Sequence, residues 1–79
     1  MSMSEVANLR QHIELEYEAM QRAMTGFAEG SARHTFITAR MNDVGYYQQA
    51  LALLIGKEAA SKFVYECYAT TVGEEGTPE

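Results

Sequence analysis

The stretch that most restricts the fold is residues 31–55, SARHTFITARMNDVGYYQQALALLI, which has the strongest apolar pattern in the chain. Its apolar side chains recur at the spacing of one face of an α-helix. They are Ile37, Val44, Tyr47, Leu51, Leu54 and Ile55. A second, weaker stripe lies beside them and consists of Ala39, Tyr46, Ala50 and Leu53. Because both stripes are apolar, we expect this helix to be buried on two sides.

Two further segments have the same periodicity. In residues 4–29 the apolar positions are Val6, Leu9, Ile13, Tyr17, Met20, Met24 and Phe27. In residues 57–71 they are Ala60, Phe63, Val64, Cys67, Tyr68 and Thr71. The only proline is Pro78, and no run alternates with the period of two that is typical of a strand. We therefore predict an all-α fold of three helices.

Glycines mark the ends of these helices. Gly30 suits the left-handed position that follows a helix, Ser31 suits the N-cap of the next one, and Gly56 separates the second helix from the third. A joint as short as Gly30-Ser31 makes the first two helices antiparallel neighbours, as in a helical hairpin. We expect residues 1–72 to form one helical domain. Residues 73–79, GEEGTPE, have the composition of a disordered acidic tail.

The length of the chain, 79 residues, favours an additional source of stability. Small domains bury a small fraction of their surface and often add disulfides, a metal or a second subunit. An internal disulfide is excluded, because Cys67 is the only cysteine. The third helix can cover one side of the central helix, and a second copy of the chain can cover the other. We expect a two-fold homodimer in which a long antiparallel helical hairpin and its copy form a four-helix-bundle-like core.

Charge and hydropathy restrict the partners. The net charge of −5 disfavours nucleic-acid binding, which depends on a basic surface. The longest apolar run, residues 51–55, is far shorter than the roughly 20 residues that span a bilayer. A lone thiol is typical of a reducing compartment, and no cationic segment precedes an apolar run near residue 1. We expect a cytoplasmic protein without a membrane partner.

Residues for metal binding or catalysis are few. His12 and Glu16 are four residues apart and could face one ion, but the chain has no Glu-x-x-His motif to complete a carboxylate-bridged site. Cys67 lies on an apolar stripe, where a thiol is usually buried and inert. The sequence contains neither a glycine-rich phosphate loop nor a Cys-x-x-Cys pair. We expect a protein that is not an enzyme and uses no metal or cofactor.

Arg33 and Arg40 are the unusual residues, because they fall on the apolar face of the central helix. A charge in that position needs a partner. We favour structural ion pairs of Arg33 with Glu29 and of Arg40 with Glu16. The alternative is a site for a small anion, since a helix N-terminus offers free N–H groups. Its candidate residues are Ser31, Arg33, His34 and Arg40.

The sequence favours a small non-enzymatic homodimer that acts as a protein–protein interaction or regulatory module. One alternative is a binding protein for a small anionic ligand near the N-terminus of the second helix. Another is an acidic inhibitor that competes with nucleic acid for a basic protein. Leu15, Ala19 and Gly26 share a face of the first helix, which is either a second interface or an ordinary exposed surface.

Overall fold

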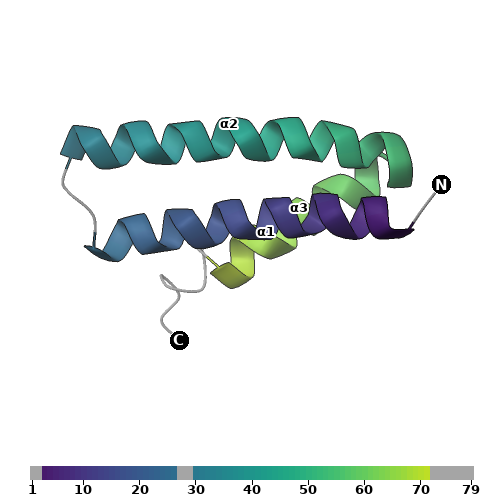
Figure 1. The fold of residues 1–79 in the computed structure, drawn as a ribbon, viewed down its shortest axis with the longest axis horizontal. Helices are drawn as coiled ribbons and strands as arrows, with labels where there is room; N and C mark the ends of the chain where they lie inside the picture. Colours follow the sequence, from purple (N-terminus) through teal and green to yellow (C-terminus); the bar gives the residue numbers. More distant parts are fainter. Residues whose placement is uncertain (1–2, 27–29, 72–79) are drawn as a thin grey trace.

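The computed structural model of the chain describes residues 3–26 and 30–71, which form three helices (Figure 1). The helices are α1 (Met3–Gly26), α2 (Gly30–Ile55) and α3 (Lys57–Thr71). Within these ranges there is no strand, which confirms the all-α prediction for this part of the chain. The last three residues of the predicted first helix, and the predicted acidic tail, lie outside the described residues.

The helices are arranged as a hairpin with a third helix packed on it. α1 and α2 lie antiparallel along most of their length, and α3 folds back from the end of α2 (Figure 1). Side chains of α3 enter the core that α1 and α2 share, so all three helices belong to one packed unit. No helix in the described part of the chain combines the length and the apolarity needed to cross a bilayer.

The glycines shape both joints. Gly56 has φ +99°, a left-handed conformation that glycine adopts without a steric penalty. Its N–H donates to the carbonyl of Ala52 at 2.8 Å, and its own carbonyl accepts from the N–H of Ala60 at 3.0 Å. This residue therefore ends α2 and begins α3, as predicted. Gly30 has φ +34°, in the left-handed region as predicted, and α2 begins at this residue. The side chain of Ser31 lies outside the described residues, so its N-cap role stays a prediction.

The core consists of apolar side chains from all three helices. Those that are buried are Val6, Ile13, Tyr17, Met20, Ala23, Val44, Leu51, Ala60 and Cys67. Except for Ala23, each belongs to a stripe that the periodicity predicts. Burial of this apolar surface is the main stabilising term for a fold of this kind. Tyr17 also meets Tyr68 edge to face, with ring centroids 6.3 Å apart.

Apart from the second stripe of α2, three described residues of the predicted stripes are more exposed than the periodicity suggests. They are Met24, Ile55 and Tyr68. Periodicity identifies the face of a helix that turns inward, but it does not tell how far a neighbouring helix extends along that face. Met24 and Tyr68 lie at one end of the hairpin, near the point where α3 finishes.

Candidate functional site

The second apolar stripe of α2 is exposed, so the expected burial on two sides does not occur within one chain. Tyr46 is 70% exposed and Leu53 is 87% exposed, although Ala50 is half-buried. Together with three neighbours these residues form what we call the outward face of α2. Its members are Ala39, Asn42, Tyr46, Gln49, Ala50 and Leu53. The core residues of α2 lie on the opposite side of the helix, against α1 and α3.

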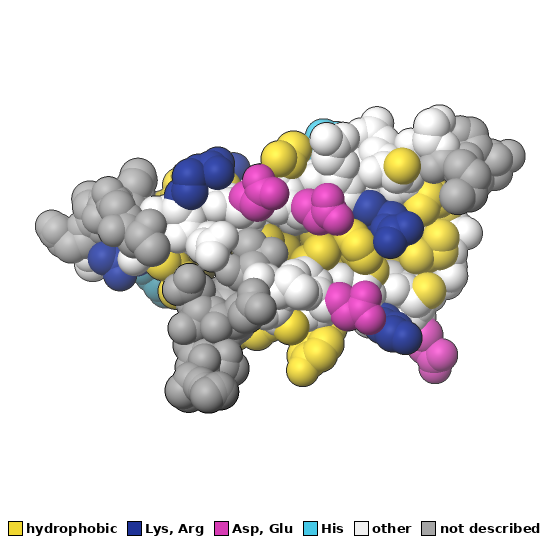
Figure 2. Space-filling model, turned by 90° about the horizontal axis from the view of Figure 1, so that it is seen from below, with side chains coloured by type: hydrophobic (Ala, Val, Ile, Leu, Met, Phe, Trp, Pro, Cys, Tyr) yellow, Lys and Arg dark blue, Asp and Glu magenta, His cyan; other side chains and the backbone are white. Residues whose placement is uncertain are grey.

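The outward face of α2 carries no charged side chain. The three charged residues of this helix are Arg33, Arg40 and Asp43, and from Val44 to Gly56 the sequence has no Lys, Arg, Asp or Glu. Seen from below, by contrast, the surface carries several charged side chains of both signs (Figure 2). A solvent-facing helix surface is normally rich in charged residues. The face of α2 therefore has the composition of a surface that another surface covers.

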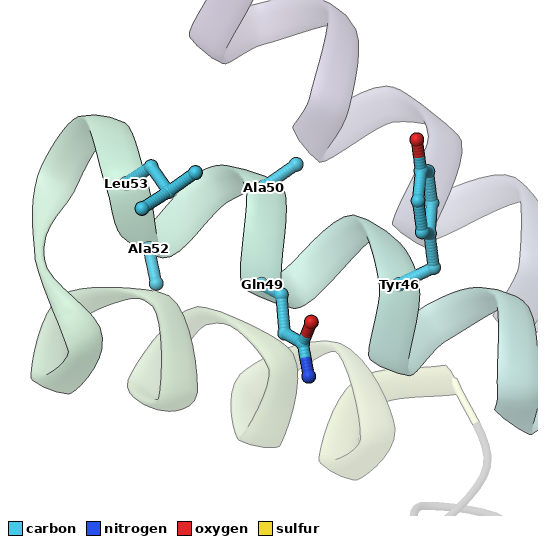
Figure 3. Close-up of a pocket in the computed structure, with 5 residues that line it drawn as sticks. All are labelled: Tyr46, Gln49, Ala50, Ala52 and Leu53. Carbon is cyan, nitrogen blue, oxygen red and sulfur yellow. The ribbon is translucent and has the colours of Figure 1, made fainter.

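Two adjoining hollows lie along this face. One has a volume of about 490 Å³ and is lined by α2 alone, where Tyr46 points toward the α1 side and Gln49 toward α3 (Figure 3). The other, of about 430 Å³, lies between α2 and the first part of α1. Tyr46, Ala50 and Leu53 line both hollows. The surface is thus continuous from the outward face of α2 to the groove beside α1.

Aromatic rings form one wall of that groove. The rings of His12 and Tyr47 stack with centroids 4.8 Å apart and planes 6° apart. Tyr46 meets Tyr47 edge to face at 5.5 Å. His12 therefore packs against the ring of Tyr47. The sequence had suggested His12 only as a possible metal ligand together with Glu16. Among the described residues, no cluster of three or more His, Cys, Asp or Glu side chains is placed to hold a metal ion.

Farther along the same side of the hairpin, Arg40 connects α2 to α1. Its Nε lies 3.4 Å from Oε1 of Glu16, and its Nη2 lies 3.4 Å from Oδ2 of Asp43. Its guanidinium also stands over the ring of Phe36, 5.2 Å from the centroid. Burial raises the pKa of Glu16, although the charge of Arg40 opposes this and the nearby Asp43 adds to it. The predicted pair of Arg40 with Glu16 is present, within a cluster that also contains Asp43.

The other residues proposed for an anion site do not join this cluster. Arg33 is half-buried and its Nε is buried without a hydrogen-bond partner among the described residues, while His34 is exposed. The side chain of Ser31 and the predicted partner Glu29 lie outside the described residues. Arg40 lies two turns beyond Arg33 along α2, about 10 Å from it along the helix axis. Its guanidinium already faces the carboxylates of Glu16 and Asp43. The structure therefore does not bring these residues together as one anion site.

Cys67 is buried in the core. Burial raises the pKa of its thiol, and the carboxylates of Glu14 and Glu66 add to this, whereas Arg10 acts in the opposite direction. A thiol that stays protonated is a poor nucleophile, because the thiolate is the reactive form. The environment of Cys67 is that of a packed apolar side chain.

No protein-family model, curated protein or solved structure matches the chain. The sequence had suggested the apolar stripe Ala39, Tyr46, Ala50 and Leu53, and the absence of charged residues from Val44 to Gly56 could have distinguished the outward face of α2 from an ordinary solvent-facing helix surface. The contact of Arg40 with Asp43 could also have been found, since the two residues are three apart on one helix.

Proposed function

We propose that the protein is a non-enzymatic homodimer that serves as a protein–protein interaction module, and that two copies meet through the outward face of α2. The observation that carries this proposal is an exposed helix face with Tyr46 and Leu53 at its centre and no charged residue. Interface cores are depleted in charge and enriched in aromatic residues, and contiguous exposed apolar surface is uncommon on monomers.

The charge of the chain favours a second copy on this face. Each copy has a net charge of −5, so most pairs of surfaces from two copies would bring acidic groups together. The outward face of α2 is a surface on which two copies can meet without that repulsion. The groove between α1 and α2 adjoins this face, so contact there would place two hairpins together as a four-helix bundle. Such a dimer also enlarges the core of a small chain.

The two alternative functions have less support. A site for a small anion would need Arg40 to be available, whereas Glu16 and Asp43 already surround its charge. The inhibitor of a basic protein would depend largely on the acidic tail, residues 73–79, which lies outside the described residues. We therefore propose that the protein acts as an interaction module and that it does so in the cytoplasm.

The dimer can be tested with two tyrosines that differ in position but not in exposure. Tyr46 on the outward face of α2 is 70% exposed, and Tyr65 on α3 is 69% exposed. In light scattering coupled to size-exclusion chromatography, we expect the wild-type protein and Tyr65→Glu to be dimers and Tyr46→Glu to be a monomer. Far-ultraviolet circular dichroism verifies that both variants remain helical. A monomeric wild type at about 100 µM, or a Tyr46→Glu variant that dimerises like wild type, would show that the proposal is wrong.

A further inference from the structure

A cluster of charged side chains lies directly beside the outward face of α2. It consists of Glu16 on α1 and of Arg40 and Asp43 on α2, and the guanidinium lies 3.4 Å from a carboxylate oxygen of each acid. Asp43 is four residues after Ala39 and three before Tyr46, so it adjoins two members of the outward face on the helix surface. Its side chain is 45% exposed, whereas that of Glu16 is 14% exposed. The cluster therefore extends from a poorly solvated position between α1 and α2 to the edge of the proposed interface.

This cluster has an excess of one negative charge when both acids are ionised, because one guanidinium faces two carboxylates. Oε1 of Glu16 and Nε of Arg40 are buried and have no hydrogen bond with the described residues. Burial raises the pKa of Glu16, and the charge of Asp43 and a hydrogen bond between the two carboxyl groups act in the same direction, against the opposing charge of Arg40. A proton on Glu16 makes the cluster neutral, with Asp43 and Arg40 as the remaining ion pair.

The groups that act on the charge of Glu16 come from α1 and α2. They are Arg40, Asp43 and His12. His12 precedes Glu16 by one turn of α1, is exposed, and lines the groove beside the outward face together with Glu5. Arg33 lies two turns before Arg40 on α2, and neither it nor Glu5 nor any charged group of α3 is among the groups that shift Glu16. The carboxyl pair with Arg40 is thus the proton-binding unit beside the interface, and the imidazole of His12 is its nearest competitor.

A second copy on the outward face would remove water from around Asp43. Loss of solvent penalises the negatively charged form of the cluster more than the neutral form. A two-fold axis also brings the clusters of both copies to one interface, where two negative clusters repel each other. Both effects favour the protonated cluster in the dimer. By linkage, an assembly that binds protons more tightly than its separate subunits becomes more stable as the pH falls.

We propose that each copy takes up a proton at the cluster of Glu16, Arg40 and Asp43 when the dimer forms, so that two copies associate more tightly in mildly acidic than in neutral solution. The inference rests on the proposed homodimer and describes a regulation of its interface. The proton comes from the solvent and binds to the carboxylate of Glu16, next to that of Asp43.

The dissociation constant of the dimer measures this coupling. Sedimentation of the whole chain at about pH 7.5, 6.5 and 5.5 gives Kd, and about 0.3 M salt screens exposed charges much more than the partly buried cluster. We expect the Kd of the wild type to fall about tenfold or more from the highest to the lowest pH. Glu16→Gln and Asp43→Asn keep the shape of the acid and leave a neutral cluster with Arg40. Both variants should dimerise at the highest pH about as tightly as the wild type does at the lowest, with a Kd that hardly depends on pH.

Two control variants separate the cluster from other sources of pH dependence. Glu18→Gln removes one exposed acid of α1 that is not among the groups acting on Glu16, so it changes the net charge of the chain as Glu16→Gln does. His12→Phe keeps a ring against Tyr47 and removes the imidazole, which can also bind a proton. We expect both controls to retain the pH dependence of the wild type. Far-ultraviolet circular dichroism at each pH verifies that all the proteins remain helical.

The outcomes distinguish this inference from the dimer itself. A wild-type dimer whose Kd stays constant or rises as the pH falls would overturn the inference and leave the dimer standing. Equal loss of the pH dependence in Glu18→Gln and Glu16→Gln would assign the effect to the net charge, and its loss in His12→Phe would assign it to the imidazole; either result overturns the role of the cluster. A wild type that is monomeric at every pH would refute both the dimer and its regulation.

Discussion

The Nε of Arg40 lies 3.4 Å from Oε1 of Glu16, and this partly buried ion pair joins α2 to α1. Both atoms are buried, yet neither makes a hydrogen bond with the described residues. A pair of this kind adds little net stability compared with an apolar pair of similar shape. Removing one partner has a larger effect, because it leaves the other charge in a poorly solvated position.

A double-mutant cycle should show this asymmetry. We expect Arg40→Met to lower the free energy of unfolding at pH 7 by about 1–2 kcal/mol, because Glu16 and Asp43 then face each other without a cation. The double variant Glu16→Gln/Arg40→Met should lose less than Arg40→Met alone. Urea denaturation of the four proteins measures the coupling. If the effects of the two substitutions simply add, the pair does not couple the helices.

The pH dependence of stability should reveal the burial of Glu16. Because burial raises its pKa in the folded state, Glu16 contributes stability that is fully present below the ordinary glutamate pKa of about 4.3. That contribution is lost as the pH rises through the raised pKa. We therefore expect the unfolding free energy of wild type, minus that of Glu16→Gln, to fall as the pH rises from about 4 toward neutral. A difference that stays constant or grows over this range would contradict the raised pKa.

Periodicity and glycine placement were sufficient to predict the three helices and the hairpin. The apolar positions of residues 31–55 repeat at helical spacing, and Gly56 adopts the left-handed conformation that separates α2 from α3. These features are local, so they can be recognised in a single sequence. The contact of Arg40 with Glu16 could be expected as well, because a short joint fixes which turns of two antiparallel helices lie side by side.

Features that depend on how far one helix extends over another could not be predicted. Met24 and Tyr68 belong to apolar stripes, but their exposure depends on where α3 finishes relative to the hairpin. The sequence also could not distinguish between a buried and an exposed second stripe on α2. Tyr46 and Leu53 are apolar in either case, and only the packing of α1 and α3 on the other side of α2 shows that a single chain leaves them exposed.

Truncating two leucines of α2 should change the free energy of unfolding by different amounts, because one lies in the core and the other on the outward face. Leu51 is fully buried, whereas Leu53 is 87% exposed. We expect Leu51→Ala to lower the free energy of unfolding by about 3 kcal/mol, because it removes buried methyl groups and leaves a cavity. Leu53→Ala should change it by less than about 0.5 kcal/mol in dilute protein, where association contributes little. Equal losses in thermal or urea denaturation would show that the inward and outward faces of α2 are assigned incorrectly.

The thiol of Cys67 provides a further test of the core. The sulfur is buried among the apolar side chains of the core that the three helices form. Burial also raises the pKa of the thiol, so little thiolate is present at neutral pH and a reagent reaches it poorly. We expect dithionitrobenzoate to react slowly with the native protein and rapidly in concentrated urea. The rate between these limits should rise with denaturant, because the reagent reaches the sulfur only when α3 separates from the hairpin. Immediate reaction in native buffer would mean that α3 does not cover this part of α1 and α2, and that Cys67 is available as a nucleophile.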